Sequence, residues 1–396
     1  MTPFGYTVLG FGSGGVVSTA RSESIPAAAE VVFESAIVQW VSVAYDQQTA
    51  GKFVVVYQDD DNSDYGTAIV GSVSGTTVSY GTPVVFESAQ TKHCDISFNP
   101  NTALKCVVCY QDQGNSQYGT ALVGTVSGTS ISFGSAVVFE SAECDRPHIS
   151  YDHNSSVDKC AIVYQDAGNS ANGTAAVGTV SGTSISFGTP VVFNAASTDW
   201  NAIAFDPNTD GKCLIQFMDG GNSNYGTCIV GQISGTSMTF GSEVTFNSGQ
   251  TQSGTVAADP NNADKYVVDF RDDPDNDKGK ARVVTVSGTT PSYGAVEEYS
   301  PGAANNQTIS FDPNNANKFA IGYNANITNQ SVFAQIGTIS GTGISFGTRQ
   351  IMEVADEQSY VKVAFDPNTP GMFIVCWRGG DPNRFGRSRL CQMESA

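Results

Sequence analysis

The tripeptide Ser-Gly-Thr recurs along the chain with a nearly constant period, and this period restricts the possible folds more than any other feature. Its spacing is 53 or 54 residues, and the six copies begin at Ser74, Ser127, Ser181, Ser234, Ser287 and Ser340. A period that holds over six copies indicates one supersecondary unit repeated in space. The Gly/Ser/Thr-rich stretch 110–134 is therefore predicted to be part of that unit and not a linker.

Each repeat divides into four short segments, none of which has helical spacing. Representative copies are Ile96–Asn101, Lys52–Asp59, Gly119–Gly128 and Ser184–Ala195. The segments are rich in β-branched and aromatic residues and are separated by Gly, Asp, Asn and Pro, which is typical of strands and turns. Four antiparallel strands in about 40–50 residues are the signature of a propeller blade. Coils of a β-helix are shorter, and immunoglobulin-like domains need about 100 residues.

The two ends of the chain complement each other. Residues Val31–Ser35 form a fourth segment without the three before it, whereas Val363–Asn368, Met372–Trp377 and a degraded Phe385–Glu394 form the first three. We therefore predict one all-β domain over residues 1–396, a seven-bladed β-propeller of four-stranded antiparallel blades. Six full repeats span about 36–353, and a composite seventh blade combines 1–35 with 354–396. An N-terminal strand in this last blade is predicted to close the ring and to remove its open edge.

Composition limits the possible partners. The chain has 19 basic and 38 acidic residues, a net charge of -19, and only 14% charged residues. This charge disfavours nucleic acids and anionic membranes, and it favours solubility. No segment approaches the ~20 apolar residues of a membrane span. The N-terminus shows no secretory signal pattern, so we expect the chain to fold in a cytoplasm.

The nine cysteines are predicted to be reduced core thiols. Cys106, Cys160 and Cys213 occupy one repeated position, at which the other repeats have phenylalanine or tyrosine, so the position is apolar. Cys106 and Cys109 lie three apart in a predicted strand and so point to opposite faces, which is poor geometry for a metal. No cofactor is expected.

Residues that stay constant between repeats are expected to serve the architecture. They include Gly66, Gly119, Gly173 and Gly226, interpreted as turn glycines. The clearest polar motif is an acidic turn that contains Asp59, Asp112, Asp166 and Asp219. Its favoured interpretation is a turn in which Asp binds its own backbone. The alternative is calcium, for which the richest copy supplies the candidates Asp272, Asp273, Asp275 and Asp277.

Residues that differ between repeats are where a ligand site is expected. The first strand of each blade lines the central channel, and the residues aligned at its mouth are Trp40, His93, Arg146, Trp200 and Tyr360, with Ser253 and Asn306 as plainer members. Two places further in are Ser42, Asp95, His148, Ala202, Thr255, Thr308 and Lys362. Aromatic residues beside polar ones predict a sugar or peptide site, and loop packing around a solvated channel is the alternative.

A catalytic centre is not predicted. His93 with Asp95, or His148 with Asp145, would make a base and its orienting acid, but no nucleophile or metal set accompanies them. We therefore expect a non-enzymatic protein and assign no catalytic residue.

Four of the nine arginines fall in the last 20 residues, at Arg378, Arg384, Arg387 and Arg389. In so acidic a protein, this cluster predicts a docking patch for an acidic partner or for another copy of the chain. The alternative is local charge compensation within the last blade.

The repeat YQDxGNSxYGTAxVGTVSGTSISFGTPVVFES, over about Val31 to Gln392, resembles that of virion structural proteins of marine and cyanobacterial tailed phages, often described as tail-fibre-like. The resemblance implies a virion component, assembled in the host cytoplasm, that acts as a tail-fibre, knob or decoration subunit. Its partners would be other virion proteins, itself or a host surface glycan. The alternative is a secreted, extracellular lectin-like propeller that binds carbohydrate, and a glycan hydrolase is less favoured because Asp95 alone does not supply paired carboxylates.

Overall fold

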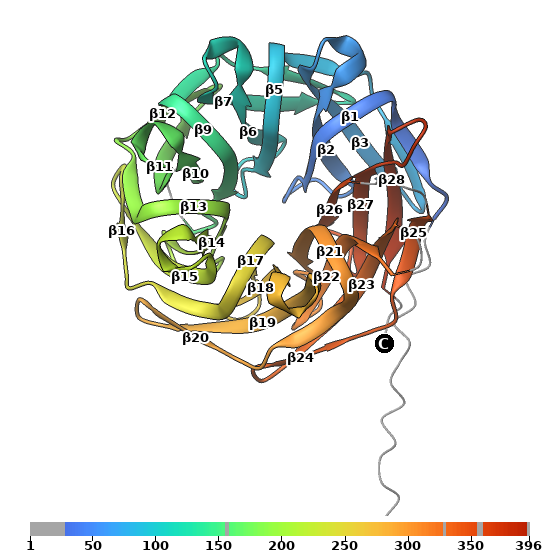
Figure 1. Ribbon diagram of the computed structural model, residues 1–396. Helices are drawn as coiled ribbons and strands as arrows, with labels where there is room; N and C mark the ends of the chain where they lie inside the picture. The colour runs from blue at the N-terminus through green and yellow to red at the C-terminus, as the bar shows by residue number, and fades with distance from the viewer. Residues whose placement is uncertain (1–27, 155–157, 328–329, 355–358, 394–396) are drawn as a thin grey trace, which may run out of the picture.

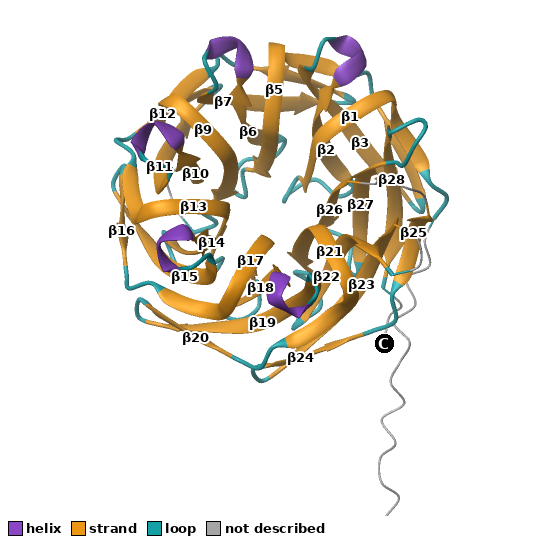
Figure 2. Cartoon of the chain, in the orientation of Figure 1, coloured by secondary structure: helices purple, strands orange, loops and turns teal. Residues whose placement is uncertain are grey.

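The computed structural model describes residues 28–154, 158–327, 330–354 and 359–393. Within them, antiparallel strands follow one another around a central opening, and short 3-10 turns lie on one face of the ring (Figures 1 and 2). The all-β prediction is confirmed. Of the residues assigned to the composite blade, 1–27, 355–358 and 394–396 lie outside the described part of the chain.

One repeat shows how the strands are connected. Strand β6 (Lys105–Asp112) pairs with the second half of β5 (Val84–Phe98) and with β7 (Tyr118–Ser127). In turn, β7 pairs with β8 (Ser130–Phe133) and with the first half of β9 (Val137–Tyr151). Each long strand therefore belongs to two neighbouring sheets, as the outer strand of one and the inner strand of the next. The sequence predicted two separate strands here, but no turn residue interrupts the segment.

The other repeats follow the same plan. The remaining long strands are β1 (Val31–Tyr45), β13 (Val191–Phe205), β17 (Val244–Ala258) and β21 (Glu297–Phe311), with β25 (Gln350–Val354) and β26 (Ser359–Phe365) at the corresponding place in the last repeat. The second strands are β2 (Lys52–Asp59), β10 (Lys159–Asp166), β14 (Lys212–Asp219), β18 (Lys265–Asp272), β22 (Lys318–Asn326) and β27 (Met372–Arg378).

The third strands are β3 (Tyr65–Ser74), β11 (Asn172–Ser181), β15 (Tyr225–Ser234), β19 (Lys278–Ser287), β23 (Gln330–Ser340) and β28 (Phe385–Gln392). The short outer strands are β4 (Thr77–Tyr80), β12 (Ser184–Phe187), β16 (Ser237–Phe240), β20 (Thr290–Tyr293) and β24 (Gly343–Phe346). The 3-10 turns are η1 (Asp60–Asn62), η2 (Gln113–Asn115), η3 (Ala167–Asn169), η4 (Gly220–Asn222) and η5 (Asp273–Asp275).

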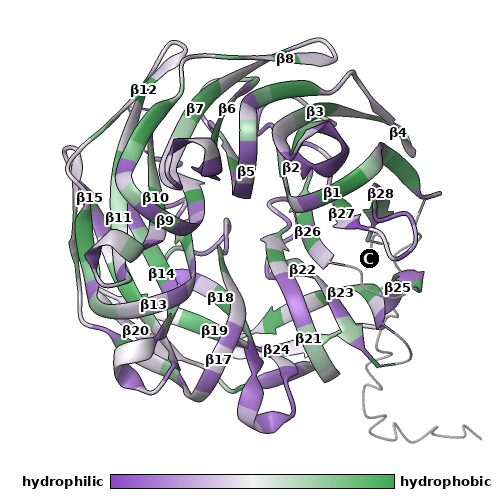
Figure 3. Cartoon of the chain, turned by 45° about the horizontal axis from the view of Figure 1, so that its top comes forward, coloured by the Kyte–Doolittle hydropathy of each residue, from purple (hydrophilic) through white to green (hydrophobic). Residues whose placement is uncertain are grey.

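The core lies between neighbouring sheets, and hydrophobic residues follow the strands while the turns are hydrophilic (Figure 3). All nine cysteines are buried and unpaired, as predicted. Cys106 packs in the core cluster on one face of its sheet and Cys109 in the cluster on the other, which confirms that they point apart.

The constant glycines at the start of the third strands are not turn residues. Gly119 pairs with Gln111 inside β7, and a Cβ atom there would lie 2.5 Å from the ring of Phe139. The equivalent Gly173 faces Phe193 in the same way. These glycines leave room for the aromatic ring of the Val-Val-Phe segment. By contrast Gly128, in the Ser-Gly-Thr turn, has a φ of 63° and does need the left-handed region.

A hydrogen bond between a tyrosine and a glutamate joins neighbouring repeats. The Tyr110 hydroxyl donates to Glu87 at 2.9 Å, and Tyr164 donates to Glu140 at 2.8 Å. Where the tyrosine is replaced by Phe217, the glutamate position holds Asn194. Phe270 is matched by Asn247 in the same manner. The two positions vary together within one chain, which indicates that each fully buried tyrosine needs the acceptor.

This pairing gives a first prediction. Tyr110→Phe removes the donor to Glu87 and should lower the free energy of unfolding by about 1–2 kcal/mol, the usual cost of a lost hydrogen bond to a charged group. Adding Glu87→Asn should restore part of this stability, because Phe with Asn is the combination used by two other repeats. Urea denaturation of the single and double variants measures the effect. Additive destabilisation by the two substitutions would contradict the prediction.

Candidate ligand site at the channel mouth

The inner half of each long strand is bent at one residue with a left-handed backbone. The φ angles lie between 49° and 56°, and the residues are Trp40, His93, Arg146, Trp200, Ser253, Asn306 and Tyr360. The strand pairing is irregular at the same place, for example between Lys92 and Asp95. Such bulges redirect a side chain out of the regular alternation. All seven residues line a single cavity at the mouth of the channel.

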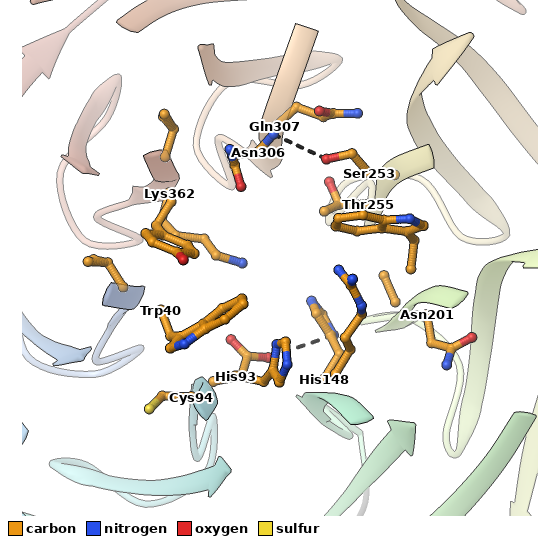
Figure 4. A pocket seen from close by; sticks show the side chains of 18 of the residues that line it. Trp40, His93, Cys94, His148, Asn201, Ser253, Thr255, Asn306, Gln307 and Lys362 are labelled. Carbon is orange, nitrogen blue, oxygen red and sulfur yellow. Dashed lines mark hydrogen bonds and ion pairs between the residues drawn. The ribbon is translucent and has the colours of Figure 1, made fainter. Parts of the chain in front are cut away.

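The five residues predicted as a ligand site are therefore brought together, along with Ser253 and Asn306. Their cavity of about 140 Å³ shares Trp200, Ser253 and Asn306 with an adjoining one of about 340 Å³. Of the deeper positions, Asp95, His148, Ala202, Thr255 and Lys362 also line the first cavity. Figure 4 shows Trp40, His93, His148 and Lys362 extending toward the middle of the channel.

Aromatic rings form two groups at this mouth. The Trp40 ring lies 4.0 Å from that of His93 and 4.9 Å from that of Tyr360, measured between ring centroids. Elsewhere on the rim, the Arg146 guanidinium lies 3.8 Å from the centroid of the Trp200 ring. The rings are half-buried and so present apolar faces to a cavity whose rim is polar.

Histidine and aspartate pair across the gap between neighbouring long strands. His93 Nε2 lies 3.0 Å from Asp145 Oδ1, and His148 Nδ1 lies 3.8 Å from Asp95 Oδ2. The pairs drawn from the sequence, His93 with Asp95 and His148 with Asp145, are therefore wrong. In both observed pairs the partner of the histidine comes from the neighbouring long strand and not from its own strand.

The pKa values follow from these contacts. The hydrogen bond from His93 lowers the pKa of Asp145, and burial lowers the pKa values of both His93 and His148. Burial raises the pKa of Asp199, whose carboxylate lies 2.8 Å from Arg146 Nε and accepts a hydrogen bond from Trp200 N. At neutral pH both histidines are neutral, because their ordinary pKa of about 6.5 is lowered further.

Sequence analysis missed a second layer of polar residues behind the mouth. Gln216 donates to the carbonyls of Trp200 and Gly254 at 2.8 and 2.7 Å. Asp269 Oδ1 accepts from the backbone and the hydroxyl of Thr255 at 2.7 and 2.8 Å. The signal was present, since the equivalent positions in the first three repeats are Val56, Cys109 and Val163. A polar residue at a repeat position that is otherwise apolar indicates a place where the channel wall is held by side-chain hydrogen bonds.

Asp269 gives a prediction about pH. Burial raises its pKa to about 7, from 3.8. The folded state therefore binds an extra proton between these values, and the carboxyl makes the protein less stable as pH rises from about 4 to about 7. Asp269→Asn retains an oxygen that can accept from Thr255, and it should remove this fall in the free energy of unfolding between about pH 4 and 7. The fall is at most about 4 kcal/mol.

Urea denaturation across this pH range measures the difference between wild type and Asp269→Asn. The exposed Asp61→Asn is the matched control and should keep the wild-type pH dependence. An unchanged slope in Asp269→Asn would show that the carboxyl is ionised in the folded protein.

Three of the four acidic turns, those of Asp112, Asp166 and Asp219, have the geometry of the favoured interpretation, whereas the Asp59 side chain does not cap its turn. Asp112 Oδ1 accepts from Asn115 N at 3.1 Å, and Asp166 Oδ1 accepts from Asn169 N at 3.0 Å. In the fifth repeat the calcium candidates pair with cations of the same hairpin. Lys280 contacts Asp272 and Asp275, and Arg271 contacts Asp273 and Asp277. The geometry gives no support to calcium, and no group of three or more metal-binding side chains is found among the described residues.

The four C-terminal arginines each have contacts within the chain. Arg378 lines the second cavity and lies 5.2 Å from the Tyr360 ring. Arg384 pairs with Asp381 at 2.7 Å, and Arg387 pairs with Glu30 and Glu353. Arg389 donates to the carbonyl of Ile351. Arg384 and Arg387 thus pair with acids of the chain itself, which agrees with the alternative of local charge compensation.

Comparison with known proteins identifies the fold and not the family. No protein-family model matches the chain, and no curated protein matches it. The BP39L lectin from Burkholderia pseudomallei is similar with a TM-score of 0.66 and 8% identity, over 88% of this chain and 94% of that chain. Two further structures are similar over nearly their whole length. A protein of unknown function from Dyadobacter fermentans has a TM-score of 0.54 and 10% identity, over 93% of this chain and 99% of that chain.

Sqt1 from Chaetomium thermophilum has a TM-score of 0.56 and 11% identity, over 94% of this chain and 100% of that chain. These likenesses support the coarse prediction of a propeller-like fold of repeated antiparallel sheets. No helix among the described residues is long and apolar enough to cross a membrane.

Proposed function

We propose that this chain is a non-enzymatic, carbohydrate-binding propeller whose ligand is held at the channel mouth. The observation that carries the proposal is the convergence of seven bulged residues on one cavity, where Trp40, His93 and Tyr360 form a continuous aromatic surface beside polar side chains. Sugars present apolar C–H faces and a rim of hydroxyls, which suit aromatic rings and polar groups respectively. One of the similar structures is itself described as a lectin, which agrees with this ligand class.

The proposal includes a closed ring of seven blades. Support comes from the pairing of β1 with β28, in which Val31 lies opposite Ser388. Tyr80 donates to the Ser388 hydroxyl at 2.7 Å, and Gly51 N donates to Asp366 Oδ2 at 3.0 Å, so the first and last repeats contact each other at several levels. The Asp366 contact repeats the one between Asp152 and Gly211 in the middle of the chain.

Binding is favoured over hydrolysis because the channel acids are engaged as hydrogen-bond acceptors. Asp95 accepts from Ser42 and from the Ile149 backbone, and the pKa of Asp145 is lowered. A glycosidase needs a carboxyl with a raised pKa to protonate the leaving group, beside a second free carboxylate. Asp199 has the raised pKa, but Arg146 holds it at 2.8 Å.

Where the ring acts is part of the same proposal. The resemblance of the repeat to phage virion proteins supports a location on a particle, where glycan binding would attach the virion to a host surface. Secretion as an extracellular lectin is the alternative. Mass spectrometry of purified phage particles and of culture medium distinguishes the two locations, and absence from every particle preparation would exclude the first.

The binding site itself is tested by substitution. A glycan array with the full chain should give hits, and Trp40→Ala should weaken the best hit about tenfold, because one aromatic stacking contact is worth ~1 kcal/mol and the His93 and Tyr360 rings lose their shared neighbour. Titration calorimetry measures the affinities. Tyr118→Ala, which removes an aromatic residue that does not line the cavity, is the control. An array without hits, or equal loss in both variants, would refute the proposal.

A further inference from the structure

Lys362 differs from the other basic side chains named above at the channel mouth. His93 faces Asp145, His148 faces Asp95, and the Arg146 guanidinium contacts Asp199. Among the described residues, no carboxylate lies within ion-pair distance of Lys362 Nζ, and no hydrogen bond holds it. Its half-buried side chain extends from β26 toward the middle of the cavity (Figure 4).

The surroundings do not supply the missing negative charge. The positive charge of Lys362 acts to lower the pKa of Asp269. The Asp269 carboxyl, however, is fully buried, and its Oδ1 accepts both hydrogen bonds from Thr255. His148, which also lies in the field of Lys362, is a base. Asp95 lines the same cavity, but its carboxylate accepts from the Ser42 hydroxyl and from Ile149 N. A half-buried ammonium without a partner is costly. In a chain with a net charge of -19, its retention at the centre of a cavity needs a reason.

We infer that the channel-mouth site takes a saccharide that carries a carboxylate, with the carboxylate on Lys362 Nζ and the sugar ring against Trp40 and Tyr360. This rests on the proposed carbohydrate-binding function and narrows its ligand to acidic sugars of the uronic acid type. Tyr360 and Lys362 are two residues apart on one strand and line the same cavity, and the Tyr360 ring lies 4.9 Å from the Trp40 ring, with the two ring planes tilted by 53°. The charged and apolar parts of the site are thus adjacent.

The charge of the site fits a single carboxylate better than a doubly charged phosphate ester, and the engagement of the Arg146 guanidinium disfavours a sulfate ester. Phosphate and sulfate are commonly recognised by arginine through two parallel hydrogen bonds. Here the Arg146 guanidinium is stacked on Trp200 and contacts Asp199. The two histidines are neutral near pH 7, because burial lowers their pKa values. Among the described residues that line the first cavity, that leaves one compact ammonium group, which matches one negative charge. Arg378 lines the adjoining cavity, where its guanidinium donates to the Ser359 hydroxyl. Asn306, whose side chain also lines the cavity, offers a neutral amide to the remaining oxygens.

The test uses matched ligands that differ only in charge. Methyl glycosides of glucuronic, galacturonic and mannuronic acid are each compared with their methyl esters by titration calorimetry on the full chain. At least one acid should bind wild type about tenfold more tightly than its ester, as expected for a hydrogen bond to a charged group. The preference should fall as ionic strength rises. Sodium acetate tests whether the site is for any carboxylate, and binding as tight as that of the best acid would exclude a saccharide site.

Variants at Lys362 test whether this side chain causes the preference for the acid over its methyl ester. Lys362→Met should bind the acid and the ester equally, at the affinity that wild type has for the ester, whereas Lys362→Arg should keep the preference for the acid. Because Lys362 has no partner in the protein, Lys362→Met should leave the melting temperature unchanged or raise it. A marked fall in melting temperature would show a structural role and overturn the inference.

The outcomes separate this inference from the proposed function. If esters and neutral glycans bind, and Trp40→Ala abolishes that binding, the carbohydrate site stands and the acidic ligand is wrong. The same holds if Lys362→Met keeps a preference for the acid. If no uronic acid, ester or array glycan binds, both proposals fail.

Discussion

The structure depends on long strands that are each shared by two neighbouring sheets. The first half of β9 pairs with β7 and its second half pairs with β10, so one unbroken segment carries the chain from one sheet to the next. Its inner half would leave backbone N–H groups open toward the preceding long strand, and a serine of that strand accepts from one of them. Ser97 accepts from Tyr151 N, and Ser150 accepts from Phe205 N. Continuity of the strand therefore creates both the contact between sheets and the wall of the channel.

The same strand also builds the site, because its bend is where it enters the channel. The left-handed residue interrupts the regular alternation of side chains and directs one of them into the mouth. Gln216 then fixes the bend at Trp200 through the backbone carbonyl, with no contact to a ligand required. Scaffold and site are thus not separate parts of the molecule. A change in the bend would move the aromatic surface and the contact between sheets together.

The sequence predicts well those features that appear when the repeats are aligned, either as residues that all repeats share or as positions at which they differ. The period of the repeat predicts the strands, and the positions that differ between aligned repeats predict the residues of the channel. The role of Gly119 was misjudged, since its reason is a ring from a segment about 20 residues away that packs on it in space. The exchange of partners between His93 and His148 was missed because a bulge shifts side chains by one place, which no column shows. Pairing across strands is decided in three dimensions.

The left-handed residues separate what the fold requires from what function adds. All seven aligned positions have this backbone, including Ser253 and Asn306, so the bend itself belongs to the architecture. Asparagine adopts the left-handed region at low cost, whereas other non-glycine residues lose about 1–2 kcal/mol. A sequence selected for stability alone would place glycine or asparagine at each bend. Tryptophan at two positions and tyrosine, histidine and arginine at three more oppose that preference. The side chains, and not the strain, therefore support the proposal of a ligand site at the mouth.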